Sequence, residues 1–143
     1  MAVSERNVEN LRRWITAFNA RDLETMIALS DPNIELHSVF AAVGGASYHG
    51  HAGMRKWHGD LEEAWGAGIR IEPEAYFDLG EHILAFAAYH GRGQQSGAEV
   101  AMPAAAVQKW RDDRMVYVKV YMQRDAALSD LGVSQDELKP IAP

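Results

Sequence analysis

The sequence of 143 residues contains no cysteine. This absence excludes disulfide bridges, thiolate nucleophiles and zinc sites built from cysteine, and it fits a reducing, cytoplasmic setting. Basic residues are few, with 14 lysines and arginines against 20 aspartates and glutamates, and they form no run. A nucleic-acid partner normally leaves a basic footprint, so we expect no such partner.

Long apolar runs are also missing. No stretch approaches the roughly 20 apolar residues that a membrane-spanning helix requires, so we expect no membrane partner. The N-terminus turns polar after three residues, unlike a signal peptide. Hydrophobic residues make up 48% of the chain and charged residues 24%, as in ordinary globular proteins. Length and composition together predict a single domain over residues 1–143.

Helical patterns occupy the first part of the chain. Within residues 4–22 the apolar side chains recur at steps of three and four, at Val8, Leu11, Ile15 and Phe18. A short second helix should begin after Asp22 as its N-cap and stop at Asp31-Pro32. A third helix is expected from Ala52 to Trp65.

Strand patterns dominate the rest. Residues 33–40 alternate, with Ile34, Leu36, Ser38 and Phe40 on one face and Glu35, His37 and Val39 on the other. Four further strand-like runs cover 69–80, 81–93, 96–113 and 114–123, and the last two meet at an Asp112-Asp113 turn. Pro73 and Pro103 indicate bulges or edge positions, because proline cannot donate to a sheet. The order predicts an α+β fold in which a curved, mainly antiparallel sheet wraps over three helices.

Four segments resemble the nuclear transport factor 2-like superfamily, in its SnoaL-like branch of polyketide cyclase and ketosteroid isomerase relatives. They are AFNARDLETMIAL, YHGHAGMRKW, GRGQQSGAEVAMPAAAVQKWRDDRMVYVKVY and YMQRDAALSDLG, and the resemblance covers about residues 8–132. It implies a cone with an internal pocket, a small apolar ligand, no cofactor and a homodimer formed through the convex sheet face. The expected pocket residues are Phe40, Met54, Trp57, His58, Phe86, Met102 and Trp110.

The stretch YHGHAGMRKWHGDLEEAW holds three histidines, His49, His51 and His58. Their spacing fits no closed zinc pattern. Gly50 and Gly53 favour a turn, which would point His49 and His51 in different directions. The resemblance places Tyr48, both glycines and Trp57 on structural positions of the family, so we expect no metal site here.

His37 lies at or near the strand position where related ketosteroid isomerases carry their catalytic carboxylate. An imidazole exchanges protons near neutral pH, so His37 could act as a general base assisted by Tyr48. The alternative is that His37 merely lines the pocket mouth. The acidic partner of the isomerases has no counterpart in PAAAVQKW, and Gln123 stands where the family motif carries an aspartate.

Two histidines of the second strand run, His82 and His90, share one face. They border the pocket if that face is concave, and they belong to a dimer contact if it is convex. Three functions therefore stay open: a cofactor-free isomerase or cyclase, a non-catalytic binding module, and a dimerising structural domain.

Overall fold

The computed structural model describes residues 3–38, 46–66, 68–92, 98–139 and 141. Its elements follow the order α1 (Val3–Asn19), α2 (Leu23–Ala28), β1 (Ser30–Ser38), β2 (Ala46–His49), α3 (Gly50–Trp65), β3 (Arg70–Asp78), β4 (His82–Arg92), β5 (Glu99–Arg111), β6 (Arg114–Tyr121), α4 (Arg124–Leu131) and a 3₁₀ helix, η1 (Gln135–Glu137). The six strands form one sheet in the order β2-β1-β6-β5-β4-β3. All neighbours are antiparallel except β1 and β6. The predicted α+β class is confirmed.

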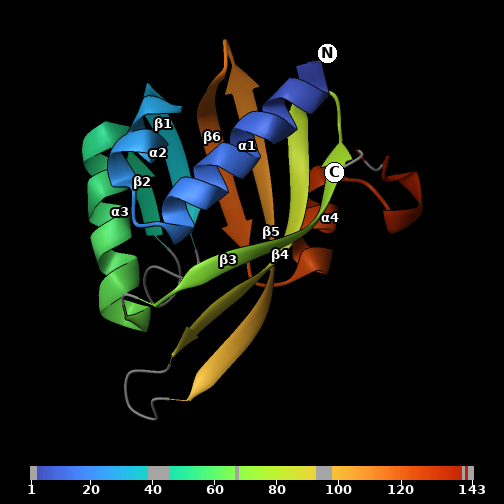
Figure 1. The fold of residues 1–143 in the computed structure, drawn as a ribbon. Helices are drawn as coiled ribbons and strands as arrows, with labels where there is room; N and C mark the ends of the chain where they lie inside the picture. Colours follow the sequence, from blue (N-terminus) through green and yellow to red (C-terminus); the bar gives the residue numbers. More distant parts are fainter. Residues whose placement is uncertain (1–2, 39–45, 67, 93–97, 140, 142–143) are drawn as a thin grey trace.

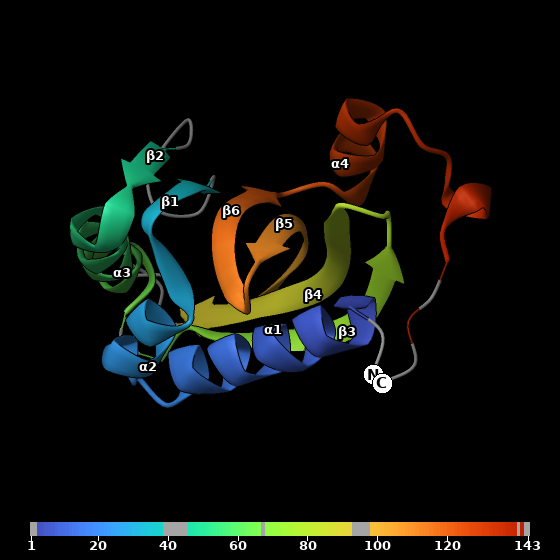
Figure 2. The same ribbon diagram turned by 90° about the horizontal axis from the view of Figure 1, so that it is seen from above.

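The sheet curves, and helices lie against both of its faces. α1 crosses one face, α3 lies beside β1 and β2, and α4 lies on the opposite side (Figures 1 and 2). The main core forms between α1, α3 and the inner sheet face, where Trp14, Phe18 and Trp57 are buried. A second cluster forms on the outer face, where Leu84 and Phe86 pack against α4. Among the described residues, no helix is both long and apolar enough to cross a membrane.

The chain enters the sheet earlier than expected. Asp22 caps α2 by accepting a hydrogen bond from the Thr25 backbone N–H (3.2 Å), as predicted. The helix ends at Ala28, however, and β1 begins at Ser30, so Asp31-Pro32 lies inside the strand. The reason is tertiary, because the Met115 N–H of β6 donates to the Leu29 carbonyl (2.9 Å) and draws this segment into the sheet. The short strand β2 was likewise not predicted.

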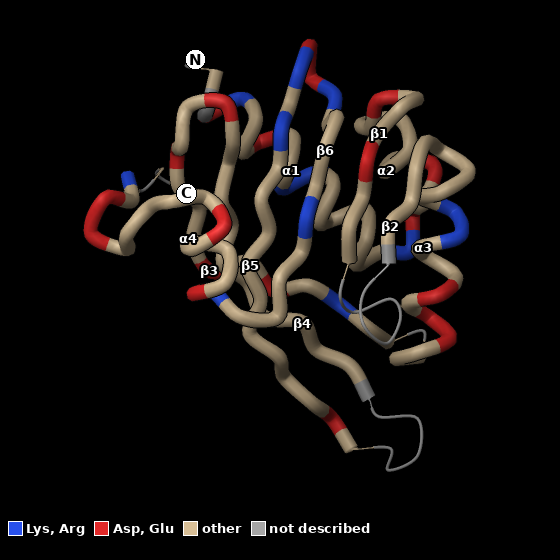
Figure 3. The backbone as a smooth tube through the Cα atoms, turned by 180° about the vertical axis from the view of Figure 1, so that it is seen from behind, with Lys and Arg blue, Asp and Glu red and all other residues tan. Residues whose placement is uncertain are grey.

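The β5–β6 hairpin closes as the sequence predicts. Asp112 and Asp113 both have positive φ, 53° and 64°, which suits a two-residue turn that follows the twist of the strands. The neighbouring charges make this tip visible in Figure 3. Asp113 accepts a hydrogen bond from the Asn10 side chain (3.2 Å), which ties the hairpin tip to α1.

Both strand prolines pair with a neighbouring strand on one side only. The register of β3 against β4 shifts between Pro73 and Ala75, and β3 is the edge strand. Pro103 pairs with β4, but the pairing of β5 with β6 reaches only as far as Ala105. The prediction of bulge and edge positions is confirmed.

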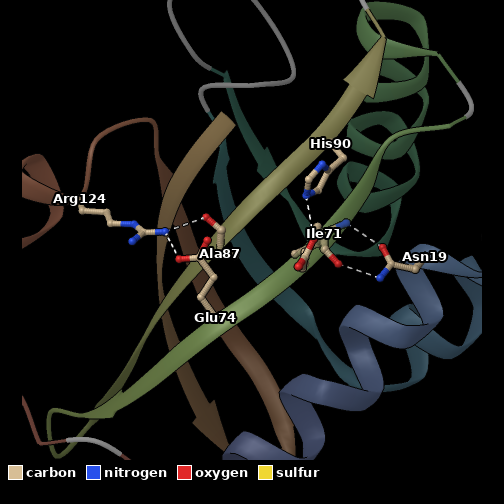
Figure 4. Close-up of polar contacts among 7 residues, drawn as sticks. Asn19, Ile71, Glu74, Ala87, His90 and Arg124 are labelled. Atoms are coloured by element: carbon tan, nitrogen blue, oxygen red, sulfur yellow. Dashed lines mark hydrogen bonds and ion pairs between the residues drawn. The ribbon is translucent and has the colours of Figure 1, made fainter. Parts of the chain in front are cut away.

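The free edge of β3 is covered at two points. The Asn19 side chain at the end of α1 forms two hydrogen bonds with the backbone of Ile71, each 2.8 Å long (Figure 4). Further along, the Ile141 N–H donates to the Tyr76 carbonyl and the Asp78 N–H donates to the Lys139 carbonyl, both at 2.9 Å. These hydrogen bonds satisfy backbone N–H and C=O groups that an open edge strand would otherwise present to another chain.

Replacing Asn19 with alanine should lower the free energy of unfolding by about 1–2 kcal/mol, because the N–H and C=O of Ile71 both lose their partner. Urea unfolding measures the change. Asn33→Ala, at an exposed asparagine whose side chain forms no such pair of bonds, is the control and should change stability by less than about 0.5 kcal/mol. Equal effects of the two substitutions would contradict the role given to Asn19.

The outer face is covered only in part. α4 packs over part of β4 and β5, and Tyr117, Lys119 and Tyr121 of β6 lie half-buried on the same face. Asp130 of α4 accepts hydrogen bonds from Lys119 (3.1 Å) and from the Tyr121 hydroxyl (2.6 Å). The pairing of two copies through this face stays a prediction.

Candidate functional site

A small, partly enclosed cavity lies between α1 and the concave face of the sheet. Its volume is about 30 Å³, which accommodates about two water molecules. The helices contribute large side chains to its wall, while β4 and β5 contribute mainly alanines. The wall consists of Leu11, Trp14, Ile15, Leu36, Trp57, Ile71, Ala85, Ala87, Tyr89, Ala104, Ala105, Ala106, Gln108, Val118 and Val120.

The alternation of the strands explains why alanines line this space. In β4 the odd-numbered residues Ala85 and Ala87 face α1, and in β5 the even-numbered Ala104 and Ala106 lie beside them. Leu84 and Phe86 of β4 face the other way. The small side chains leave the gap beneath the bulky residues of α1.

Two polar atoms in the wall have no hydrogen bond partner among the residues that the structure describes. They are Oε1 of Gln108, a residue that is 3% exposed, and Nε1 of Trp57, which is 2% exposed. Leaving a buried donor or acceptor unpaired costs about 1–3 kcal/mol. Burial also raises the pKa of Tyr89 far above its ordinary value, so this hydroxyl stays neutral. The cavity thus combines an apolar wall with one free acceptor and one free donor.

Of the predicted pocket residues, Trp57 lines this cavity. Phe86 does not line it: this residue faces the outer side, where Arg124 lies over its ring with Cζ 4.7 Å from the centroid. Met54 is buried within the core behind the wall, and Met102 and Trp110 pack at the margin of the core. These three, with His58, are not part of the wall. Phe40 lies outside the described residues.

His37 lies on the outer side of β1, opposite to Leu36. Its Nδ1 shares a hydrogen bond with the Ser47 hydroxyl (2.8 Å), and its Nε2 lies 3.7 Å from a Glu35 carboxylate oxygen. The ring also contacts Tyr117, with centroids 5.6 Å apart. The side chain is therefore held within the sheet surface and does not reach the interior cavity.

Tyr48 points to α3 rather than to His37. It pairs with Leu36 in the ladder, is 8% exposed, and donates its hydroxyl hydrogen to Asp60 (2.7 Å). Burial and this carboxylate raise the pKa of Tyr48 well above its ordinary value. The two predicted catalytic residues are not brought together, because they stand on opposite faces of the β1–β2 pair.

The three histidines of the YHGH stretch diverge. His49 ends β2 and is exposed, while His51 donates from Nε2 to the Ser30 carbonyl (2.9 Å). His58 packs edge-on against Phe18, and burial lowers its pKa. Within the described ranges, no three histidine, aspartate or glutamate side chains gather as metal ligands do.

His82 and His90 lie on the outer face, since the inner positions of β4 are the odd-numbered ones. Nε2 of His90 lies 2.9 Å from a carboxylate oxygen of Glu72 on the neighbouring strand (Figure 4). Burial lowers the pKa of His82. Neither histidine borders the interior cavity. The sequence left open whether they lie on the concave or the convex face, and in the structure they lie on the convex face.

Gln108 was not among the residues predicted from the sequence. Its position in β5 could have identified it. Every second residue of this strand points inward, at Ala104, Ala106 and Gln108, and Gln108 is the polar residue among these three. A polar side chain at an inward strand position needs a partner, and this requirement singles it out.

Comparison with known proteins places this geometry in a family. Residues 11–118 match the SnoaL-like domain. No protein of curated function matches the chain. The fold is similar to that of TerC crystallised with polyporic acid, with a TM-score of 0.73, 19% identity and coverage of 88% of this chain and 97% of TerC.

Two further solved structures are similar in fold. A protein of ketosteroid isomerase-like fold from Catenulispora acidiphila DSM 44928, in complex with trimethylamine, gives a TM-score of 0.71 at 16% identity, covering 94% of this chain and 98% of that one. A putative SnoaL-like polyketide cyclase from Jannaschia sp. CCS1 gives a TM-score of 0.72 at 13% identity, and the match covers 90% of this chain and 92% of that one. With a matched region that spans most of its length, the chain belongs to the SnoaL-like domain family.

Proposed function

We propose that the chain binds a small, largely apolar molecule in the interior cavity, with its polar group held between Gln108 and Trp57. The observation that carries this proposal is the buried, unpaired amide oxygen of Gln108 in a wall of alanines. A ligand hydroxyl or amine would donate to this oxygen, and a ligand oxygen would accept from the Trp57 N–H. Apolar walls with a few placed polar groups are typical of small-molecule sites.

The relatives support a ligand of modest size. One similar structure is a complex with trimethylamine and another was crystallised with polyporic acid. The cavity of about 30 Å³ is smaller than an organic molecule needs, so α1 and the sheet must move apart on binding. The ligand would bind a more open conformation better than the closed one, and would therefore shift the population toward it.

Binding without catalysis fits the cavity better than proton transfer does. An isomerase or cyclase needs a general base within hydrogen bond reach of its substrate. Among the described residues, no histidine, aspartate or glutamate lines the cavity wall, and His37 and Tyr48 are engaged elsewhere. Catalysis through His37 therefore gains no support from this geometry.

A structural role without a ligand is the second candidate. The observation in its favour is the same small volume, because side chains fill nearly all of the space beneath α1. Under this alternative, the unpaired Gln108 oxygen would be met by a buried water molecule.

Phenol and toluene distinguish these candidates, since phenol carries a hydroxyl where toluene carries a methyl group of similar size. We expect saturable binding of phenol, followed by calorimetry, and binding of toluene weaker by about tenfold. Gln108→Leu should remove the preference for phenol. It should also raise the unfolding midpoint by about 3 °C, because it removes an unpaired buried acceptor worth about 1 kcal/mol.

Gln123→Leu is the matched control, since Gln123 is exposed at the start of α4. It should leave both the preference and the midpoint unchanged. Absence of any saturable binding would favour the structural domain and contradict the proposed function.

A further inference from the structure

A second, larger hollow lies outside the interior cavity, along the seam between α1 and the edge strand β3. It is an open groove of about 530 Å³, lined by Arg12, Ile15, Thr16, Asn19, Pro73, Glu74, Ala75, Tyr76 and Ile141. It is distinct from the interior cavity, with which it shares only Ile15. We refer to it as the α1–β3 groove.

The edge of β3 explains the groove. Asn19 binds the strand at Ile71, and the C-terminal segment binds it at Tyr76. Between these two attachments, the bulge at Pro73 and Ala75 interrupts the regular ladder. A bulge bends its strand, and the groove lies beside this bend, between α1 and β3.

Arg12 brings an unpaired positive charge to this groove. Its Nη2 is buried without a hydrogen bond partner, and Arg12 forms no ion pair with any residue that the structure describes. The guanidinium lies over the Tyr76 ring, with Cζ 5.2 Å from the centroid. A buried charged donor without an acceptor is costly, so this group is suited to an anionic partner.

Tyr76 supplies a second free donor. The residue is 6% exposed, and its hydroxyl has no hydrogen bond partner in the described part of the chain. Burial raises the pKa of the Tyr76 hydroxyl, although the neighbouring Arg12 opposes this rise. The hydroxyl is therefore protonated at neutral pH and can donate.

Glu74 is the carboxylate in the groove wall, but it is already neutralised from the other side of the strand. Arg124 of α4 donates to Glu74 (2.5 Å) and to the Ala87 carbonyl (3.3 Å; Figure 4). The charge of Glu74 is thus offset by Arg124, and the charge of Arg12 is left without a counter-ion. The groove presents a net positive site next to apolar surface from Ile15, Pro73 and Ile141.

We propose that the α1–β3 groove binds a small organic carboxylate. Its two oxygens accept hydrogen bonds from the Arg12 guanidinium and the Tyr76 hydroxyl, and its hydrocarbon body packs on Ile15, Pro73 and Ile141. A carboxylate carries a single negative charge, which one arginine balances, whereas a phosphate group carries about −1.5 to −2 at neutral pH. The site is independent of the interior cavity and of the ligand proposed there.

Phenylbutyrate, its neutral counterpart phenylbutanamide, and inorganic phosphate are the probes. We expect phenylbutyrate to cause saturable NMR shifts at the backbone amides of Ile15, Tyr76 and Ile141, and the amide to bind weaker by about tenfold. Equal affinity for the two organic probes would overturn the proposal. Phosphate producing the same shifts with equal affinity would also overturn the assignment to a carboxylate.

Arg12→Gln should lower the affinity for phenylbutyrate by about tenfold. Arg13→Gln, at the adjacent exposed arginine that bonds Asn10, is the matched control and should leave the affinity unchanged. Tyr76→Phe removes one oxygen from an otherwise unaltered ring, so it should weaken binding even if Arg12→Gln folds poorly. Equal affinities of the Arg12 and Arg13 variants, both shown to be folded by their unfolding midpoints, would overturn the role of Arg12.

Gln108→Leu separates this groove from the interior cavity. Phenylbutyrate binding should persist in that variant, because Gln108 does not line the groove. Loss of binding in Gln108→Leu would place the probe in the interior cavity and would overturn the second site. Failure of phenol to bind, in contrast, would affect only the function proposed for the interior cavity.

Discussion

Trp57→Ala should lower the free energy of unfolding by about 4 kcal/mol, within the range for removing a large aromatic side chain from a core. Trp57 is 2% exposed and lies where α3 meets α1. Its ring centroid is 5.6 Å from that of Trp14 and 5.7 Å from that of Phe18. Because Trp57 also lines the interior cavity, the space left by the indole would join a cavity that already exists. The surrounding side chains would then have little opportunity to close the gap.

Urea unfolding monitored by far-UV circular dichroism measures this loss. Met122→Ala is the control, since Met122 is 54% exposed, and its effect should stay within about 0.5 kcal/mol. A loss below about 1 kcal/mol for Trp57→Ala would mean that α1 and α3 repack easily. That result would contradict the close packing of Trp57 against Trp14 and Phe18.

Gly50→Ala should be the second most damaging of the substitutions considered, at about 2–3 kcal/mol. Gly50 starts α3 with φ of +71°, a backbone conformation that costs a residue with a Cβ about 1–2 kcal/mol. A Cβ at this position would lie 3.1 Å from the Pro32 carbonyl oxygen. This neighbour is backbone within β1, so it cannot rotate away as a side chain would.

Gly59→Ala is the matched control within the same helix. A Cβ there would meet nothing within 4 Å, and the position is exposed in the interior of α3. Alanine should therefore stabilise the protein by about 0.5–1 kcal/mol, through the higher helix propensity of alanine. If Gly50→Ala were equally stabilising, the strained entry to α3 would be refuted. Thermal and urea unfolding of the two variants give the comparison directly.

The local elements follow from the sequence because their causes are local. The spacing of Val8, Leu11, Ile15 and Phe18 requires one buried helix face, and all four residues are buried on α1. The Asp112-Asp113 turn depends on two adjacent residues that tolerate positive φ. The spacing of Tyr48 and Gly53 also has a local cause, because Tyr48 packs closely on the start of α3. A Cβ on Gly53 would lie 3.1 Å from the Cβ of Tyr48.

Strand alternation correctly divided the residues of each strand between two faces. It did not show which of these faces lies inside the fold. Leu36 and His37 fall on opposite faces, as the pattern predicts, yet only the packing of α1 shows that Leu36 lines the interior cavity. The same ambiguity explains the misplacement of Phe86. Both faces of β4 are apolar, because α1 covers one face and α4 covers the other.

The sequence by itself determined the α+β class, the first three helices, the strands other than β2, and the alternation within each strand, because these depend on neighbours a few positions apart. The tertiary structure decided the rest. It paired β1 with β6 in parallel, although more than 75 residues separate them in the chain. It placed Gln108 beneath α1, and it brought Arg12 over Tyr76. Contacts of this kind depend on how the sheet curves and on which helix covers each face, and no short segment of the sequence records either property.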